Sequence, residues 1–349
     1  MNQKINNKCF SCIIFFISEY MFLGTGFNQI LTESKNNSLI CLIIGFIVSI
    51  ILFKFIINIF NYESNLNIIE KVDKIYGKVF GKIINYILLI TILFLFIYTL
   101  WNTQIYIQNK YLDKTPNYVI LILFLLPIIY VINKGFNTFT KLSLMIFIIS
   151  LIEIFLVFIG IIPYIEIDNY KPLFNSSFIC SIKSIYYFVS FFISPIYLIL
   201  LLPKSNIDKK DHFNFFYVLS FLNIFLLAAS IIGTFSVELS SILNYPEFVL
   251  VKKINYFNFI QHIENILSTQ WLYTMFIFAT MCLFYIKTFF ENKKINIKLL
   301  YFLIFISFII SLNLFTNTTL GYNFIHTYYH IISFFILMFI IITNILIKN

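Results

Sequence analysis

The chain has 349 residues, of which 60% are apolar and only 11% are charged. A soluble domain usually has about 45–50% apolar and about 25% charged residues, so the charged side chains are too few to cover a soluble surface. This composition excludes a soluble enzyme, a nucleic-acid-binding domain and a disordered chain. The formal net charge is +9 and every cation is a lysine, and a basic excess in a membrane protein commonly sets topology. We predict an all-α polytopic membrane protein.

Hydrophobic runs predict ten membrane-spanning helices. A helix needs roughly 20 mostly apolar residues to cross the hydrocarbon of a bilayer, which is about 30 Å thick. Such runs cover about residues 10–31, 38–60, 83–108, 117–133, 142–163, 181–203, 213–237, 268–290, 298–316 and 322–347. The polar stretches between them are too short for a large soluble domain, so we expect one integral membrane domain over residues 1–349.

Lysines near the span ends predict the orientation of the chain. With these ten spans, 17 lysines fall on one side of the membrane and seven on the other. The lysine-rich side is normally cytoplasmic, and an even number of spans returns the chain to the side where it started. Both termini are therefore predicted to be cytoplasmic.

Two polar stretches are predicted to form helices outside the spans. Residues 64–82 carry apolar residues at three- and four-residue spacing, which predicts an amphipathic helix along the cytoplasmic interface, capped by Ser64 or Asn65. Residues 238–266 predict one or two short helices on the outer face, broken at Pro246. Each segment could brace the bundle or contact a substrate, and we favour bracing.

Two spans carry residues that interrupt a helix. Ten spans divide into five plus five, and matching interruptions in the two halves of a transporter mark the substrate site. The predicted substrate-binding residues are Gly24, Thr25 and Gly26 in the first span and Ser190, Ser194 and Pro195 in the sixth. Glycine frees the backbone and proline removes a donor, an arrangement suited to a small zwitterion such as an amino acid. Close helix packing through small residues is the alternative explanation.

Two carboxyl groups are predicted to lie within the membrane. Glu19 precedes Gly24 by five residues, and Glu153 lies near the middle of the fifth span. A carboxylate at such a depth is costly unless it faces the bundle interior or carries a proton. Each is therefore a candidate for proton coupling. A protonated or hydrogen-bonded packing carboxyl is the alternative for both.

The histidines and cysteines predict neither a metal site nor a cofactor. His326 and His330 lie one helical turn apart in the last span, but a third ligand is missing nearby, so packing or interfacial histidines are expected. Cys9 and Cys12 form a single C-x-x-C at the start of a hydrophobic run. A zinc or redox site would need a second pair or a different context.

Several short motifs occur in a fixed order from about residue 10 to residue 290. They are Gly24-Thr25-Gly26 in the first span, Gly77 and Gly81 in the amphipathic helix, the segment 133–143, the loop with Pro163, Asp168, Asn169 and Pro172, Pro203 after the sixth span, and the connection from Gly233 to Glu264 with Pro246. In this order and spacing the sequence resembles the GerAB/GerKB family of spore germination permeases, within the amino acid–polyamine–organocation superfamily.

The resemblance implies a LeuT-like bundle of two inverted five-helix repeats, at about residues 10–163 and 181–347, with broken first and sixth helices. It implies that a small nutrient, often an amino acid, binds between the first, third, sixth and eighth helices. It also implies a protein of the spore inner membrane that acts beside an A-type membrane subunit and a C-type lipoprotein.

Three functions are weighed against these observations. The resemblance favours a germinant-receptor subunit that binds a small solute and triggers spore germination. The same fold also suits a proton-coupled amino-acid permease in which Glu19 or Glu153 carries the proton. A membrane acyltransferase or glycan-modifying enzyme would need a histidine, aspartate or arginine near a span end, whereas all four histidines follow residue 211 and arginine is missing. We therefore expect no enzyme, and the expected partners are the small solute, the two receptor subunits and the lipid bilayer, without nucleic acid.

Overall fold

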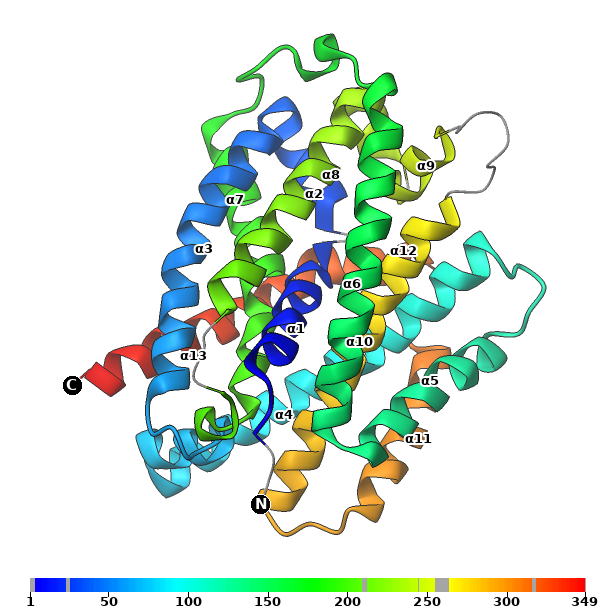
Figure 1. The fold of residues 1–349 in the computed structure, drawn as a ribbon. Helices are drawn as coiled ribbons and strands as arrows, with labels where there is room; N and C mark the ends of the chain where they lie inside the picture. Colours follow the sequence, from blue (N-terminus) through cyan, green and yellow to red (C-terminus); the bar gives the residue numbers. More distant parts are fainter. Residues whose placement is uncertain are drawn as a thin grey trace.

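The computed structural model describes residues 4–22, 26–208, 212–243, 245–254, 264–315 and 318–348, with the backbone alone for residues 264–267 and 318. Within these residues the secondary structure is helical apart from one isolated bridge between Ile5 and Ile207. The elements are α1 (Asn7–Glu19), α2 (Phe27–Ser34), η2 (Lys35–Asn37), α3 (Ser38–Asn61), α4 (Ile68–Lys110), α5 (Asn117–Lys134), α6 (Phe136–Ile161), η3 (Ile162–Tyr164), η4 (Ile167–Tyr170), α7 (Phe178–Ile193), η5 (Ser194–Leu201), η6 (Lys204–Asn206), α8 (Phe213–Ile242), α9 (Pro246–Lys252), α10 (Glu264–Asn292), α11 (Lys298–Asn313), α12 (Thr318–Phe324), η7 (Ile325–Tyr329) and α13 (His330–Lys348) (Figure 1).

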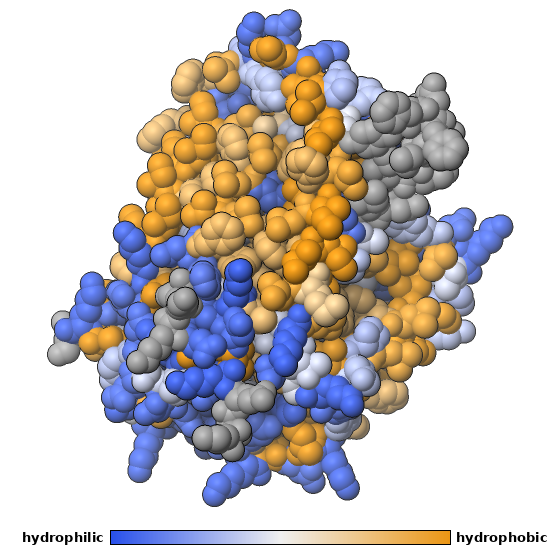
Figure 2. All heavy atoms as spheres, viewed as in Figure 1, coloured by the Kyte–Doolittle hydropathy of each residue, from blue (hydrophilic) through white to orange (hydrophobic). Residues whose placement is uncertain are grey.

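Apolar side chains cover the outside of the bundle. Ile47, Leu123 and Phe155 are 57%, 61% and 65% exposed, and Figure 2 shows a hydrophobic band between two more polar ends. Among the described residues, eight helical stretches have the length and hydropathy to cross a membrane, and α11 is a shorter apolar helix. Such a surface is stable in lipid and not in water. The protein is therefore an integral membrane protein built from helices.

The first predicted span is divided into two short helices. α1 has 13 residues and α2 has 8, so neither can cross a bilayer alone. The chain reverses at Lys35, whose φ is 50°, and α3 then packs along α7. Gly45 permits this close packing, because a Cβ there would lie 2.6 Å from Cδ1 of Phe188.

The amphipathic helix predicted at 64–82 exists, but its start and its end differ from the prediction. Helix α4 begins at Ile68, and its cap is Asn67, whose side chain accepts from the Glu70 N–H while Glu70 accepts from the Asn67 N–H. This reciprocal capping box satisfies two backbone donors. Ser64 and Asn65, the predicted caps, lie in the turn before it.

A corner at Gly77 separates this first part of α4 from its membrane-spanning part. Gly77 has φ 78° and ψ 171°, a conformation that favours glycine. The two arms then fold against each other at Gly81, where a Cβ would lie 2.8 Å from Cα of Asp73. Asn85 fastens the corner by donating to the Ile69 carbonyl at 3.0 Å and to Asp73 at 2.9 Å.

One end of the bundle gathers segments that are distant in sequence. Lys74 pairs with Glu63 at 2.5 Å, and Lys293 pairs with Asp73 at 2.7 Å. Nearby, the Ser205 N–H donates to the Ser64 carbonyl, and the N-terminal segment joins the same end through the Ile5–Ile207 bridge. These segments carry lysines that were all predicted to share one side of the membrane.

Three boundaries differ from those expected. Segment 133–143 is mostly helix, because α6 begins at Phe136 directly after a turn at Gly135 with φ 92°. α8 continues to Ile242 with one left-handed residue, Ser236, at φ 61°. Pro246 opens α9 from its first turn and does not break a helix, since proline is well tolerated where no N–H is needed. The remainder of the predicted outer helices, residues 255–263, lies outside the described residues.

Candidate functional site

The first interruption separates α1 from α2. α1 ends at Glu19 and α2 begins at Phe27. Between them the Gly26 N–H donates to the Met21 carbonyl at 3.1 Å, which closes a turn wider than that of an α-helix. Gly24 and Thr25, two of the predicted site residues, lie outside the described residues.

Gly26 is explained by close packing. Its φ of −70° and ψ of −33° are open to any residue, so the expected need for backbone freedom is wrong at this position. A Cβ would lie 2.8 Å from the Met21 carbonyl oxygen and 2.9 Å from the ring of Phe191. Glycine is required here because the first span packs closely against α7 at its interruption.

The second interruption lies where the sequence predicts it, at Ser194. The α-helical geometry of α7 ends at Ile193, and η5 continues the chain as an eight-residue 3₁₀-helix whose residues are all buried. Runs of 3₁₀-helix longer than three or four residues are uncommon and often mark a hinge or a site under strain. Pro195 stands in its first turn. The backbone of this span therefore tightens from α-helix to 3₁₀-helix and does not unwind.

A third interruption lies in the last span and was not predicted. η7 is a π-helical turn over Ile325–Tyr329 between α12 and α13, a feature that often marks functional sites. The Tyr329 hydroxyl is hydrogen-bonded to Ser194 Oγ at 2.8 Å, and His330 Nδ1 to Ser190 Oγ at 2.8 Å. The second and third interruptions thus meet side chain to side chain.

α2 completes this polar centre. Gln29 Oε1 lies 2.8 Å from His330 Nε2, and the Gln29 amide donates to the His326 carbonyl at 3.0 Å. The ring of Phe191, which contacts Gly26, also stacks on Tyr329 with centroids 5.3 Å apart. Gly26, Ser190 and Ser194 are therefore brought together as predicted. Gln29 and Tyr329 were not predicted, and His330 was expected to be a packing or interfacial histidine.

Three tyrosine hydroxyls beside this centre have no hydrogen-bond partner among the described residues. They belong to Tyr98 on α4, Tyr197 on η5 and Tyr285 on α10, and all three residues are fully buried. The Tyr197 hydroxyl is within electrostatic range of Tyr285 and Tyr329. Buried polar groups are nearly always hydrogen-bonded, so these three hydroxyls are available to hydrogen-bond a polar molecule in this interior region.

Glu19 lies at the edge of the first interruption. It is fully buried, and it accepts from Asn223 Nδ2 on α8 at 2.7 Å and from Gln270 Nε2 on α10 at 3.5 Å. Within the described part of the chain it forms no ion pair. A buried carboxyl held by amides alone is costly as an anion, which keeps Glu19 a candidate for carrying a proton.

Glu153 occupies a different place. One of its oxygens accepts from Thr269 Oγ1 at 2.8 Å, and the other, Oε2, is buried without a partner among the described residues. Thr269 precedes Gln270 in α10, so two consecutive residues of this helix contact Glu153 and Glu19, respectively. None of the contacts found for Glu153 reaches Ser190 or Ser194.

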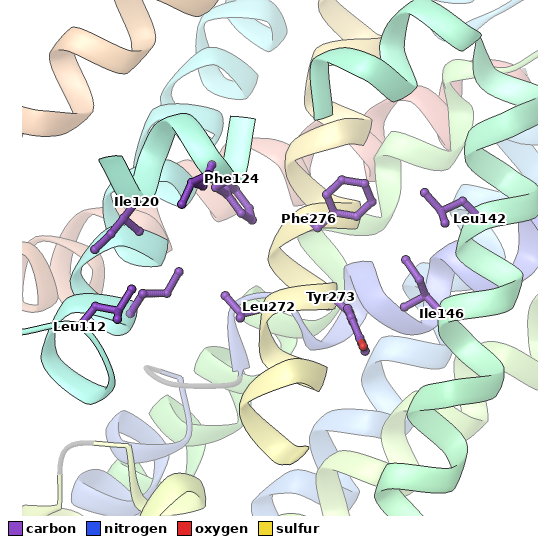
Figure 3. Close-up of a pocket in the computed structure, with 10 residues that line it drawn as sticks. Leu112, Ile120, Phe124, Leu142, Ile146, Leu272, Tyr273 and Phe276 are labelled. Carbon is purple, nitrogen blue, oxygen red and sulfur yellow. The ribbon is translucent and has the colours of Figure 1, made fainter. Parts of the chain in front are cut away.

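An open apolar groove lies next to Glu153. It has a volume of about 460 Å³ and is lined by residues of α4, α5, α6 and α10. Phe124 lies on the α5 side of the groove, and Tyr273 and Phe276 lie on α10 (Figure 3). Tyr273 is within electrostatic range of Glu153. An apolar groove of this kind suits lipid chains and not a polar solute.

The described residues contain no group of three or more histidine, cysteine or acidic side chains that could hold a metal. Cys9 and Cys12 are free thiols, and Cys12 donates weakly to the Cys9 carbonyl at 3.1 Å. The functional groups at the polar centre are serine and tyrosine hydroxyls, the His330 imidazole and the Gln29 amide. They can bind a small polar molecule by hydrogen bonds.

Interrupted helices around a buried polar centre, inside a lipid-facing bundle, define a membrane protein of the permease class. Residues 8–320 match the family model of spore permeases, whose description is spore germination protein. The match covers most of the chain, so the protein belongs to the spore germination protein family, as the sequence resemblance indicated. A comparison with curated proteins found no significant match.

Proposed function

We propose that this protein is the membrane subunit of a nutrient germinant receptor, and that it binds a small solute, an amino acid, to trigger spore germination. The observation that carries the proposal is the meeting of three helix interruptions. The second and third are joined by the hydrogen bond between Ser194 and Tyr329, and the first lies against them through Gly26 and Gln29, beside buried tyrosine hydroxyls without partners among the described residues. Family membership supplies the biological setting.

The proposed topology has ten spans in a LeuT-like arrangement of two five-helix repeats. Eight long apolar stretches have the length to cross, and the first of them, Phe27–Asn61, contains both α2 and α3. In the proposed count α3 alone makes that crossing, and α1 with α2 makes a separate, interrupted one. The other seven stretches add seven crossings, and α11, with 16 residues, makes the tenth. In this arrangement both termini face the cytoplasm, because the lysine-rich end of the bundle also holds the N-terminal segment.

Ligand binding would act by shifting a two-state equilibrium. Hydrogen bonds that involve Gln29, Ser190 and Ser194 already join α2, α7 with η5, and the last span. A solute that binds more tightly to one arrangement of these helices favours that arrangement. The partners proposed to respond to this change are an A-type membrane subunit and a C-type lipoprotein in the spore inner membrane.

The experiment that tests this function is germination of spores that lack the chain. Spores would be exposed to each of the twenty amino acids, and germination followed by the loss of optical density. The proposal predicts that the deletion abolishes the response to at least one amino acid, and that the gene restores it. Deletion spores with an unchanged response to all twenty would contradict it.

A proton-coupled amino-acid permease is the second candidate, favoured by the two intramembrane carboxyls. Glu19 and Glu153 form no ion pair within the described residues, and each is held by neutral donors. In proteoliposomes with an inward proton gradient, this candidate predicts concentrative amino-acid uptake that Glu19→Gln or Glu153→Gln abolishes. A receptor without transport would bind the solute and show no uptake.

A further inference from the structure

A second polar cavity lies at the C-terminal end of α2, about one helical turn beyond Gln29 of the polar centre. Thr32, which lines the cavity, donates to the Gln29 carbonyl at 3.0 Å. The volume of the cavity is about 470 Å³, within the usual range of small-molecule sites. Its walls are the end of α2 with η2, the loop around η4, and the segment of α8 that follows its left-handed residue. α3 starts beside this cavity at Ser38 and ends at Asn61, next to the lysine-rich end. The cavity therefore opens at the opposite end of the bundle.

Asn36 supplies a polar group to the cavity. The residue lines the cavity, is only 8% exposed, and forms no side-chain hydrogen bond with another described residue. Its amide is open to the cavity and free to bond to a molecule that enters it. The neighbouring Asn37 points elsewhere, with Oδ1 accepting from the Phe174 N–H and Nδ2 donating to Ser176.

Charges of both signs surround the cavity. Lys171 and Asp168 form an exposed pair at 3.0 Å. Lys35 and Glu238 also line the cavity, and neither side chain pairs with another described residue. A cation and an anion that stay apart across one small cavity are complementary to a molecule that carries both charges.

The wall is held in place before any ligand arrives. The Glu166 N–H and the Asn169 side chain both donate to the Gly233 carbonyl, at 2.9 and 2.7 Å. Two lining residues, Lys35 and Ser236, have left-handed φ values of 50° and 61°. Non-glycine residues keep this conformation where the surroundings enforce it, often at ligand sites. The cavity is therefore preorganised for a ligand.

We propose that this cavity is a second binding site for a free α-amino acid, separate from the site at the interrupted helices. Glu238 and Asp168 attract the ammonium group, while Lys35 and the Asn36 amide bind the carboxylate. α2 connects the two sites, because its first turns carry Gln29 of the polar centre and its end carries Thr32 of the cavity. The cavity would thus bind the solute before or beside the central site.

The test is equilibrium dialysis of the full-length protein in lipid nanodiscs against each of the twenty radiolabelled amino acids. The main variant is Lys35→Ala with Glu238→Ala, since both side chains are exposed and their loss should not affect folding. Asp113→Ala with Lys114→Ala removes the same charges from another exposed loop and is the matched control. Ser194→Leu fills the central site. Acetate and methylamine, each with one charge only, serve as competitors.

Two bound molecules per chain are expected, falling to one in the Lys35→Ala/Glu238→Ala protein and staying at two in the control. Acetate or methylamine alone should compete at least tenfold more weakly than the amino acid.

A single bound molecule that Ser194→Leu abolishes and the double variant retains would overturn the second site and leave the central one. A single molecule lost only in the double variant would support the cavity and contradict the central site. Absence of binding in folded protein would overturn both.

Discussion

Gly26 shows how one missing methyl group sets the distance between two spans. The glycine has ordinary helical dihedral angles, and its small size lets the first interruption contact Phe191 on α7. Close to this contact, Ser190 is hydrogen-bonded to His330 and Ser194 is hydrogen-bonded to Tyr329. The geometry of the polar centre thus depends on a contact that contains no polar side chain.

Replacing Gly26 with alanine is predicted to destabilise the protein by about 1–3 kcal/mol, the usual cost of overpacking. The new Cβ would lie 2.8 Å from a backbone oxygen that cannot move aside alone. Thermal denaturation in detergent measures the effect as a lower Tm. An unchanged Tm would show that the interruption has room to relax and that the close approach is not needed.

The residues of the polar centre divide into those that the sequence could reveal and those that it could not. Gly26 stands out because the chain has only nine glycines, and Ser190 and Ser194 stand out because they precede Pro195, one of only seven prolines. Tyr98, Tyr197 and Tyr285 do not stand out, since the chain has 23 tyrosines and only burial without a partner distinguishes these three. His330 was visible, but its two partners come from residues more than 100 positions away.

At the scale of elements, helix type was more predictable than helix ends. The run 64–82 predicted an amphipathic helix, yet two candidate caps precede the true one by two and three residues, and only side-chain geometry selects Asn67. The corner at Gly77 joins this helix to the following span. The π-turn in the last span, with the sequence IHTYY, was not predicted, because nothing in its hydropathy distinguishes a π-helical turn from an α-helical one.

Asn67→Ala is predicted to destabilise the protein by about 1 kcal/mol, because the Glu70 N–H and the Asn292 amide lose the Asn67 side-chain acceptor. The bond from the backbone N–H of residue 67 to Glu70 remains. Asn65→Ala provides a matched control, since Asn65 is exposed and no hydrogen bond of its side chain is found in the described structure. Unfolding by denaturant compares the two variants. Equal effects of the two substitutions would contradict the assignment of the cap.

For the whole molecule, hydropathy predicted the membrane class and most of the spans, because lipid requires continuous apolar helices. Hydropathy could not locate the polar cavity at Asn36, which forms from three segments between residues 31 and 241. Such a site depends on how the helices pack. A single sequence does not determine the rotation of each helix about its axis.

The orientation of the protein in the membrane is testable by cysteine labelling. The starting protein carries Cys180→Ser, which removes the one native cysteine that is not buried, and each of two variants then adds one new cysteine. Ser205→Cys marks the lysine-rich end and Asn175→Cys the cavity end. In intact cells an impermeant maleimide is predicted to label residue 175 and to leave residue 205 unlabelled until the membrane is opened. The reverse pattern would invert the proposed topology, and labelling of both would contradict opposite ends.

The most direct measurement of the central claim is amino-acid affinity of the purified protein with Tyr197→Phe. The Tyr197 hydroxyl has no partner among the described residues, so its removal should leave Tm unchanged or raised, while affinity for the solute falls roughly fivefold to tenfold. Tyr217→Phe is the control, because its hydroxyl donates to Ser49 at 2.5 Å, and it should lower Tm without changing affinity. Equal affinity in unaltered protein and in Tyr197→Phe, Tyr98→Phe and Tyr285→Phe would contradict a ligand site at the interrupted helices.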